Sequence, residues 1–155
     1  MHIDVLNKMH MDIAVSMAKY SKATRAKVGA VLVTSNGVVL PSYNGTPVGT
    51  DNSCEEDGVT KPTTIHAELN CVGKSAKEGV SIDGATLYVT LSPCRHCAAV
   101  LIQVGIRRVV YLEEYRDMSG VMFLSENGIK VEQYKYEHES LFSYSNEKTQ
   151  TPHYP

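Results

Sequence analysis

The hydrophobic residues near the N-terminus recur at steps of three and four positions between residues 3 and 20. That spacing is typical of one face of an amphipathic helix, which we expect to pack on a sheet. The residues on this expected face are Ile3, Leu6, Met9, Ile13, Met17 and Tyr20.

Two short apolar runs follow, Val28–Val33 and Val38–Leu40, and the turn residues Ser35-Asn36-Gly37 separate them. An Asn-Gly turn adopts the left-handed dihedral angles that suit a hairpin, so this pattern predicts two paired strands. The stretch from Ser42 to Thr64 is rich in Gly, Pro, Asn, Asp and Ser. Its composition predicts a loop without regular structure for most of its length, and a loop this long is often functional.

Helical and strand patterns alternate along the second half of the chain. The alternation predicts parallel strands joined by right-handed crossovers. The expected order is helix His66–Glu78, strand Ala85–Leu91, helix Cys94–Val104, strand Arg107–Leu112, a short helix, and strand Ile129–Tyr134.

The chain of 155 residues is long enough for one domain with its own core. We place that domain at residues 1–136. Residues 137–155 are mostly polar, and we expect them to form a mobile end or an arm that lies on another subunit.

Composition and charge narrow the classes of partner. The chain has 15 Lys and Arg against 17 Asp and Glu, a net charge of -2, which is too near neutrality for non-specific nucleic-acid binding. Its apolar runs fall far short of the roughly 20 residues that span a bilayer. We therefore expect no nucleic-acid partner and no membrane segment.

The N-terminus lacks a basic segment followed by an apolar stretch, so we expect a cytoplasmic protein, or one in the host cytoplasm if the source is viral. In a reducing compartment its four cysteines are expected to be metal ligands or free thiols rather than disulfide partners.

Two predicted helix starts carry the candidate chemistry. His66-Ala67-Glu68 opens one helix, and Pro93-Cys94-Arg95-His96-Cys97 opens the other. Helix N-termini lower the pKa of thiols, and the thiolate is the form that binds metal. Two thiolates and one imidazole, from Cys94, Cys97 and His66, favour zinc and leave a fourth position for water.

Glu68 lies two residues beyond His66 and does not need to be a ligand. Zinc lowers the pKa of bound water toward about 7, and a nearby carboxylate can accept the proton and pass it on. A zinc-bound histidine, a glutamate, and a proline before paired cysteines form the signature of the zinc nucleobase deaminases.

Other roles remain open for the remaining candidates. Cys54 is either a fourth metal ligand or a free thiol, Cys71 is expected to be a core thiol, and His96 is expected at the surface. A Cys-x-x-Cys pair alone also suits a structural zinc module that only mediates interactions, in which Glu68 would be an ordinary acid at a helix start.

The segments that carry these residues resemble the deoxycytidylate (dCMP) deaminase family, especially its phage members. The resemblance covers about residues 5–134 and rests on four segments. They are Lys27-Val28-Gly29-Ala30-Val31, the loop Tyr43-Asn44-Gly45-Thr46-Pro47-Val48-Gly49, His66-Ala67-Glu68-Leu69-Asn70, and residues 84–97 with the sequence GATLYVTLSPCRHC.

This resemblance implies a three-layer α/β fold of the cytidine-deaminase type, with a mixed five-stranded sheet flanked by helices. It also implies hydrolysis of dCMP to dUMP and ammonia, which would feed dTMP synthesis. His66, Cys94 and Cys97 would hold zinc and Glu68 would move protons. By the same resemblance, the Asn44 side chain would bind the sugar, the Ala67 amide the pyrimidine carbonyl, and the Ser92 carbonyl the exocyclic amine.

A monophosphate needs positive charge or hydrogen-bond donors. Lys22, Thr24, Arg25 and Lys27 cluster between the first helix and the first strand, and one or two of them are expected to bind it. Tyr115 and Arg116 follow a predicted strand whose carboxyl end should lie near the zinc, so they are further candidates.

Members of the family are similar in being homohexamers that dCTP activates and dTTP inhibits, with Mg²⁺ accompanying the triphosphate. The loop from Asn44 to Asp51 is the candidate effector site. The residues that the resemblance assigns to it are Lys22, Tyr43, Gly45, Pro47, Gly49 and Asp51.

Two related enzyme activities are alternatives to dCMP deamination. A tRNA adenosine deaminase carries the same zinc motif, but RNA binding favours a basic surface or stacking aromatic residues, whereas this chain has no Trp and only two Phe. A deaminase of free cytidine would act equally well on the nucleoside.

Overall fold

The computed structural model describes residues 3–137, so all of the expected tail except Glu137 lies outside the described residues. None of the helices in this range combines the length and apolar composition needed to cross a membrane. The elements are α1 (Ile3–Ala18), β1 (Gly29–Val33), β2 (Val39–Tyr43), β3 (Glu55–Glu56), β4 (Val59–Thr60), α2 (Ala67–Glu78), β5 (Thr86–Leu91), α3 (Arg95–Gln103), β6 (Arg108–Glu113), α4 (Ser119–Glu126) and β7 (Lys130–Gln133).

The main sheet has five strands in the order β2-β1-β5-β6-β7. Strand β1 pairs antiparallel with both β2 and β5, whereas the pairs β5–β6 and β6–β7 are parallel. The helices α3 and α4 form the two crossovers between the parallel strands. The predicted mixed sheet, its hairpin and its parallel half are therefore confirmed.

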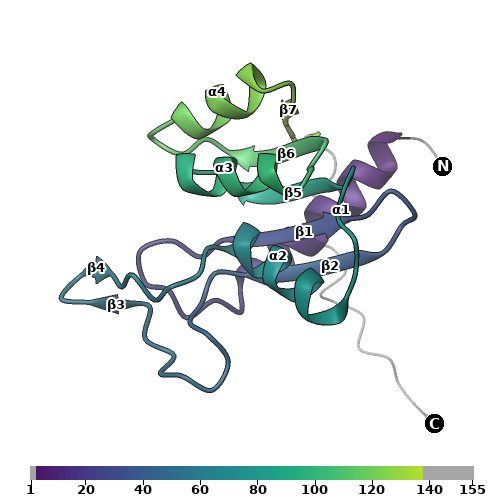
Figure 1. Cartoon of the computed structure of the whole chain (residues 1–155). Helices are drawn as coiled ribbons and strands as arrows, with labels where there is room; N and C mark the ends of the chain where they lie inside the picture. Colours follow the sequence, from purple (N-terminus) through teal and green to yellow (C-terminus); the bar gives the residue numbers. More distant parts are fainter. Residues whose placement is uncertain (1–2, 138–155) are drawn as a thin grey trace, which may run out of the picture.

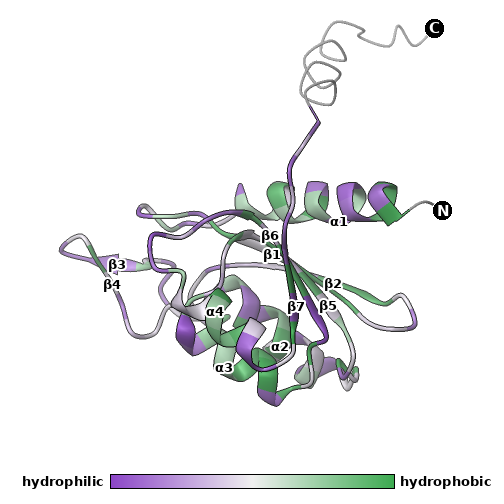
Figure 2. Ribbon diagram, turned by 90° about the horizontal axis from the view of Figure 1, so that it is seen from above, coloured by the Kyte–Doolittle hydropathy of each residue, from purple (hydrophilic) through white to green (hydrophobic). Residues whose placement is uncertain are grey.

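The helices cover both faces of the sheet and make three layers (Figures 1 and 2). Helix α1 lies on one face, and α2, α3 and α4 lie on the other. The larger core fills the space under α2, α3 and α4, and includes Leu87, Leu101 and Val109. A smaller core lies under α1 and is centred on Met11, Ala14 and Tyr88. This arrangement confirms the expected three-layer α/β fold.

Helix α1 packs on the sheet as expected, but the face assigned to it from sequence is wrong. The buried residues of α1 are His10, Met11 and Ala14, whereas Ile3 is 59% exposed and Met9 is 42% exposed. Close packing explains the difference, because a Cβ on Gly29 of β1 would lie 1.8 Å from the carbonyl oxygen of Ala14. The helix approaches the strand on its small residues and leaves much of its apolar stripe exposed.

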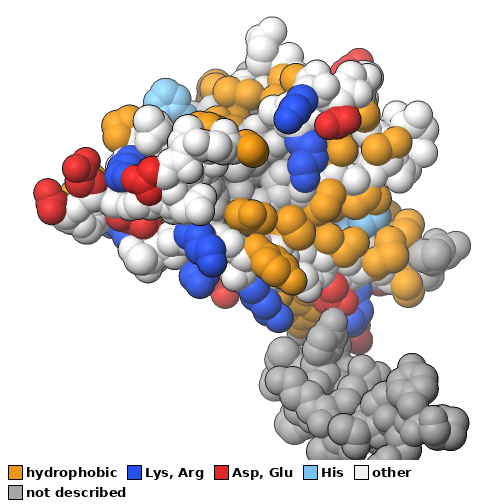
Figure 3. Space-filling view, turned by 90° about the horizontal axis from the view of Figure 1, so that it is seen from below, with side chains coloured by type: hydrophobic (Ala, Val, Ile, Leu, Met, Phe, Trp, Pro, Cys, Tyr) orange, Lys and Arg blue, Asp and Glu red, His pale blue; other side chains and the backbone are white. Residues whose placement is uncertain are grey.

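Further exposed apolar residues lie close to those of α1. Val38 and Val39, where the β1–β2 turn leads into β2, are also exposed, and α1 contacts β2. Figure 3 shows hydrophobic side chains gathered on the side of the molecule that carries α1 and the edge strand β2.

The long loop after β2 contains one regular element that sequence analysis did not identify. Strands β3 and β4 pair antiparallel, Glu55 with Thr60 and Glu56 with Val59. The turn between them is Asp57-Gly58, and both residues have positive φ angles, 52° and 75°. Figure 1 shows this hairpin projecting beyond the end of the main sheet.

Candidate metal centre and pocket

Two helix N-termini bring the predicted metal ligands together. His66 is the N-cap residue of α2 and Cys94 is the N-cap residue of α3, and both have extended backbone dihedral angles. Pro93 precedes α3, where a missing amide costs no intrahelical hydrogen bond. The α2 and α3 helices lie on the same face of the sheet, so their first turns meet at one end of β5 (Figure 1).

The three predicted ligands form a compact cluster. The ligand atoms of His66, Cys94 and Cys97 all lie within 4.8 Å of one another. The Nδ1 atom of His66 is 3.6 Å from the Cys94 sulfur and 3.3 Å from the Cys97 sulfur. In residues 3–137 this is the only group of three or more His, Cys, Asp or Glu side chains with such spacing, and it does not include Cys54.

The surroundings of the two sulfurs shift their pKa values in opposite directions. Hydrogen bonds from Cys97 and His66 lower the pKa of Cys94 to about 3, although its partial burial opposes this. The pKa of Cys97 is raised, first by its hydrogen bond to Cys94 and then by burial. The hydrogen bond to Cys94 also raises the pKa of His66, against the effect of desolvation.

The donor set fits zinc. Two cysteine sulfurs and one imidazole nitrogen are the ligands that zinc prefers, and three protein ligands are typical of a catalytic rather than a structural site. The remaining cysteines lie elsewhere: Cys54 is buried directly before β3, and Cys71 is buried in the larger core with its sulfur 3.3 Å from the Leu40 carbonyl oxygen. His96 is exposed, as expected.

Glu68 lies in the first turn of α2, beside the metal cluster. It is only 4% exposed, and burial raises the pKa of its carboxyl to about 7. A buried carboxyl group with a raised pKa beside a cluster of metal-binding side chains is typical of a catalytic acid or base. Glu68 and two members of the cluster, His66 and Cys94, border the same pocket, so the carboxyl is placed to act on a bound molecule.

Helix α4 supports the backbone of the metal-binding loop from behind. A Cβ on Gly120 would lie 2.1 Å from the carbonyl oxygen of Pro93 and 2.7 Å from the carbonyl carbon of Cys94. Such distances are far below van der Waals contact, so only glycine permits this approach. The first turn of α4 therefore fixes the position of Cys94 through direct backbone contact.

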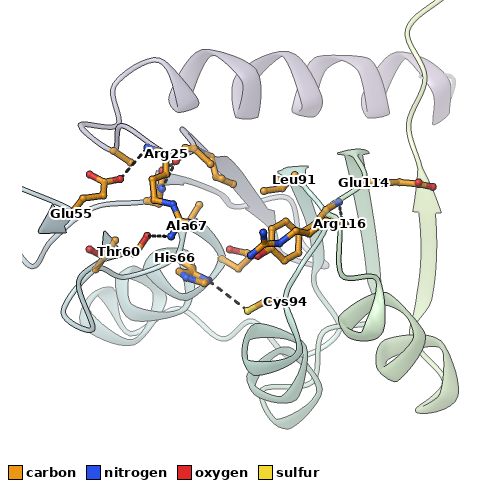
Figure 4. A pocket seen from close by; sticks show the side chains of 17 residues that line it. Arg25, Glu55, Thr60, His66, Ala67, Leu91, Cys94, Glu114 and Arg116 are labelled. Atoms are coloured by element: carbon orange, nitrogen blue, oxygen red, sulfur yellow. Dashed lines mark hydrogen bonds between the residues drawn. The ribbon is translucent and has the colours of Figure 1, made fainter. Parts of the chain in front are cut away.

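A pocket of about 370 Å³ opens above the metal cluster, a volume suited to a small ligand. Figure 4 shows Arg25, Glu55 and Thr60 on one side of it, and Leu91, Glu114 and Arg116 on the other, with His66 and Cys94 between them. The lining residues are Ala23, Arg25, Ala26, Val28, Asn44, Glu55, Thr60, Thr64, His66, Ala67, Glu68, Leu91, Ser92, Cys94, Glu114, Tyr115 and Arg116.

Asn44, which was predicted to bind the sugar of the substrate, borders this pocket. Its side chain also stabilises the wall of the pocket at residues 26–28. Its Oδ1 accepts a hydrogen bond from the Val28 amide at 2.8 Å, and its Nδ2 donates to the Ala26 carbonyl at 2.8 Å. A side-chain amide has two N–H groups and two lone pairs on its oxygen. Asn44 can therefore hold residues 26–28 and still bind a ligand.

Ser92, which was also predicted to bind substrate, follows β5 and connects it to the segment that follows β6. Its buried hydroxyl accepts a hydrogen bond from the Tyr115 amide at 2.7 Å and lies 3.5 Å from the Met118 sulfur. The ring of Tyr115 in turn lies under the Arg116 guanidinium, 5.7 Å from its centre. Ser92 thus fixes the segment that carries both Tyr115 and Arg116 into the pocket.

Of the basic cluster predicted to bind phosphate, only Arg25 borders this pocket. Lys27 lines a neighbouring cavity of about 340 Å³ between the end of α1 and the ends of β5 and β6. The Thr24 amide donates a hydrogen bond to the Glu55 carboxylate. The six residues assigned to an effector site lie outside both cavities: Lys22, Tyr43, Gly45, Pro47, Gly49 and Asp51.

Four polar pocket residues were missed by sequence analysis: Glu55, Thr60, Thr64 and Glu114. Glu55 and Thr60 belong to the β3–β4 hairpin, and the Asp57-Gly58 pair was the available signal, since Asp-Gly favours a tight turn. Glu114 directly follows β6, next to the predicted Tyr115.

Comparison with known proteins agrees with this geometry. The cytidine and deoxycytidylate deaminase zinc-binding region matches residues 5–113. The deoxycytidylate deaminase of Enterobacteria phage T4 is 33% identical over 147 residues, covering 68% of this chain and 76% of the phage enzyme. The human deoxycytidylate deaminase is 36% identical over an alignment of 121 residues, and the match covers 69% of this chain and 65% of the human enzyme.

The fold is also similar to a solved structure with bound nucleotides. The crystal structure of dCMP deaminase from the cyanophage S-TIM5 in complex with dCMP and dUMP has a TM-score of 0.79 and 41% identity to this chain. The match covers 83% of this chain and 96% of that one.

Proposed function

This chain belongs to the cytidine and deoxycytidylate deaminase family, and from that membership we propose that it converts dCMP and water to dUMP and ammonia. It is a zinc-dependent deaminase, and therefore a hydrolase. We choose dCMP as the substrate because this chain is similar, over most of its length, to an enzyme whose structure was solved with dCMP and dUMP.

His66, Cys94 and Cys97 would hold the metal. A zinc ion bound there would lower the pKa of water toward about 7 and so supply the nucleophile. The oxygen of that water would add to C4 of the cytosine. The Glu68 carboxylate would take the first proton of the water and deliver it to N3 of the base. Glu68 would then take the second proton from the oxygen now bound to C4 and deliver it to the amine nitrogen, so that the C4–N4 bond breaks, the C4 carbonyl forms and ammonia leaves.

The backbone at the two helix starts would orient the base. Ala67 is the first residue of α2, where backbone N–H groups have no partner within the helix, and its amide is proposed to donate to O2 of the pyrimidine. The Ser92 carbonyl is proposed to accept a hydrogen bond from the exocyclic amine. The Asn44 side chain, at the opposite wall, is proposed to bind the sugar.

The charged residues at the mouth of the pocket suit a monophosphate. Arg25 and Arg116 are both exposed lining residues, and they approach from opposite sides (Figure 4). Guanidinium groups bind phosphate oxygens in a bidentate manner. We assign phosphate binding to Arg25 and Arg116, with Tyr115 supporting Arg116. Lys27 and Thr24 are assigned lesser, indirect roles.

An absorbance assay for loss of the cytosine chromophore tests the proposed activity. The zinc-loaded protein should turn over dCMP much faster than deoxycytidine, because the phosphate contributes binding energy. Adenosine in tRNA should not react. Turnover should stop after chelation and return with zinc. Equal rates on dCMP and deoxycytidine, or reaction with tRNA alone, would contradict the assignment.

Regulation and assembly follow the family pattern in our proposal. We propose a homohexamer that dCTP with Mg²⁺ activates and dTTP inhibits, with the triphosphate bound near Lys22 and the segment Tyr43–Asp51. This segment is held in place at both ends: Gly45 bridges to Ile65, and Asp51 forms an ion pair with Lys61 at 3.1 Å. The product dUMP would feed dTMP synthesis in the cytoplasm.

The exposed apolar side chains on α1 and at the β1–β2 turn support self-association, since monomeric proteins rarely expose large apolar patches (Figure 3). Light scattering on the eluting protein measures the number of subunits. Rate curves in dCMP should be sigmoidal without dCTP and hyperbolic with it. A monomer, or curves that neither triphosphate changes, would contradict the proposal.

A further inference from the structure

The β3–β4 hairpin is docked on the loop between α1 and β1, at the mouth of the pocket. Glu55 of the hairpin accepts two hydrogen bonds on one carboxylate oxygen, from the backbone N–H groups of Thr24 at 2.9 Å and Arg25 at 3.2 Å. The Arg25 guanidinium in turn contacts the Thr60 hydroxyl at 3.5 Å. Arg25 is thus held by the hairpin at both its backbone and its side chain (Figure 4).

The base of the hairpin is itself well anchored. Cys54, directly before Glu55, is 1% exposed, and its carbonyl accepts hydrogen bonds from the Lys61 amide and the Thr64 hydroxyl. The Ser53 hydroxyl donates to the Glu55 carbonyl. These bonds connect Glu55 to the start of α2, and therefore to the segment that ends at His66.

The Glu55 carboxylate is charged at neutral pH. Desolvation acts to raise its pKa, but the hydrogen bonds from the Arg25 and Thr24 amides outweigh it, and the pKa is lowered. Two consecutive backbone amides are the kind of donor set that binds an anion. In this protein the chain supplies that anion, so the loop is ordered around Glu55 before any ligand enters.

We propose that Glu55 is a positioning residue for recognition of the substrate's 5′-phosphate, acting by holding Arg25 at the mouth of the pocket. Glu55 does not bind the phosphate, because both groups are anionic. Its effect comes from fixing the backbone from which the Arg25 side chain extends. This inference rests on the proposed function, in which Arg25 binds a nucleoside monophosphate.

The test compares a substrate that has the phosphate with one that lacks it. In Glu55→Ala the KM for dCMP should rise about tenfold, while kcat for dCMP changes less than about threefold, because only binding of the phosphate is weakened. The value of kcat/KM for deoxycytidine should stay within about twofold of wild type. Glu56→Ala, on the exposed neighbour in β3, is the matched control and should behave as wild type.

Glu55→Gln keeps one acceptor oxygen for the two amides and should recover much of the loss, which also guards against a misfolded Ala variant. Binding of dUMP and deoxyuridine, measured by calorimetry, gives the same comparison without turnover. In Glu55→Ala the affinity for dUMP should fall and that for deoxyuridine should not, whereas Glu56→Ala should match wild type for both.

A double-mutant cycle with Arg25→Ala tests whether Glu55 acts through Arg25. Glu55→Ala should add little to the loss in Arg25→Ala. Additive losses, or an equal loss on deoxycytidine, would overturn the inference and leave the proposed function standing. A wild-type enzyme that does not prefer dCMP over deoxycytidine would overturn the proposed function itself, and the inference with it.

Discussion

The metal end of the pocket and the end to which we assign the phosphate, called here the phosphate end, are built in different ways. The metal end consists of two helix starts on a packed sheet, with Glu68 and Cys97 buried and Gly120 pressed against the metal-binding loop. The phosphate end consists of loop segments and a hairpin whose strands have two residues each, with Arg25 and Arg116 exposed. Rigid, buried groups suit the bond-breaking chemistry, and exposed loops leave room for substrate selection.

The largest expected effect is on the chemistry at the metal end. Glu68→Gln keeps the size of the side chain but removes its ability to carry a proton. We expect kcat for dCMP to fall by about 10²–10⁴, the range typical of a lost general acid or base. Zinc content, measured by atomic absorption, should remain at the wild-type value. An active Glu68→Gln enzyme would contradict the assigned role.

The metal end could be predicted from sequence because its signals are local. The residues before and inside two helix starts carry the ligands, so the pattern around His66 and Pro93-Cys94 identifies both their position and their chemistry. The parallel half of the sheet was predictable for the same reason, since helix and strand patterns alternate there.

At the phosphate end the sequence pointed to Arg25, Tyr115 and Arg116, but the contacts that hold this end together could not be predicted, because they join distant segments. Glu55 reaches residues 24 and 25 from about 30 positions away. Strands of two residues are too short for any hydrophobic period. The buried face of α1 was mispredicted for a related reason: it depends on close approach between Ala14 and Gly29, which a hydrophobicity pattern does not weight.

Gly120→Ala should show how far the metal end depends on support from α4. The added Cβ would overlap the backbone of Pro93 and Cys94, so the cysteine must move. We expect zinc affinity, measured by competition with a chromophoric chelator, to fall about 10- to 100-fold, as for lost outer-shell support of other metal sites.

Gly73→Ala is the matched control for this substitution. Gly73 lies within α2, and a Cβ there would have no neighbour within 4 Å. It should keep wild-type zinc affinity and gain slightly in stability, because Ala favours a helix more than Gly does. Equal zinc affinity in both variants would show that α4 does not position Cys94.

Ser92→Ala should affect the phosphate end while leaving the metal end intact. It removes the acceptor of the Tyr115 amide, and an unpaired buried donor costs about 1–3 kcal/mol. The segment carrying Arg116 should loosen, and kcat/KM for dCMP should fall about fivefold to tenfold. Zinc content should not change.

Ser75→Ala is the control for loss of a buried serine hydroxyl. Ser75 lies in α2, and its hydroxyl donates to the Val72 carbonyl, away from the pocket. Its kinetics should equal those of wild type. If Ser92→Ala also lost zinc, the two ends of the pocket would be less independent than their construction implies.

The smallest effect is expected at Lys27. Its side chain lines the neighbouring cavity rather than the main pocket, whereas Arg25 lines the main pocket itself. Lys27→Ala should therefore change the KM for dCMP by less than about twofold, since a distant exposed charge is screened by salt.

Arg25→Ala should raise that KM at least about tenfold, because it removes a paired charge at the phosphate. Measuring both at low and at physiological ionic strength separates direct contact from long-range attraction. A Lys27→Ala effect as large as that of Arg25→Ala at both ionic strengths would mean that the phosphate lies on the α1 side of the loop, and the proposed orientation of the nucleotide would be wrong.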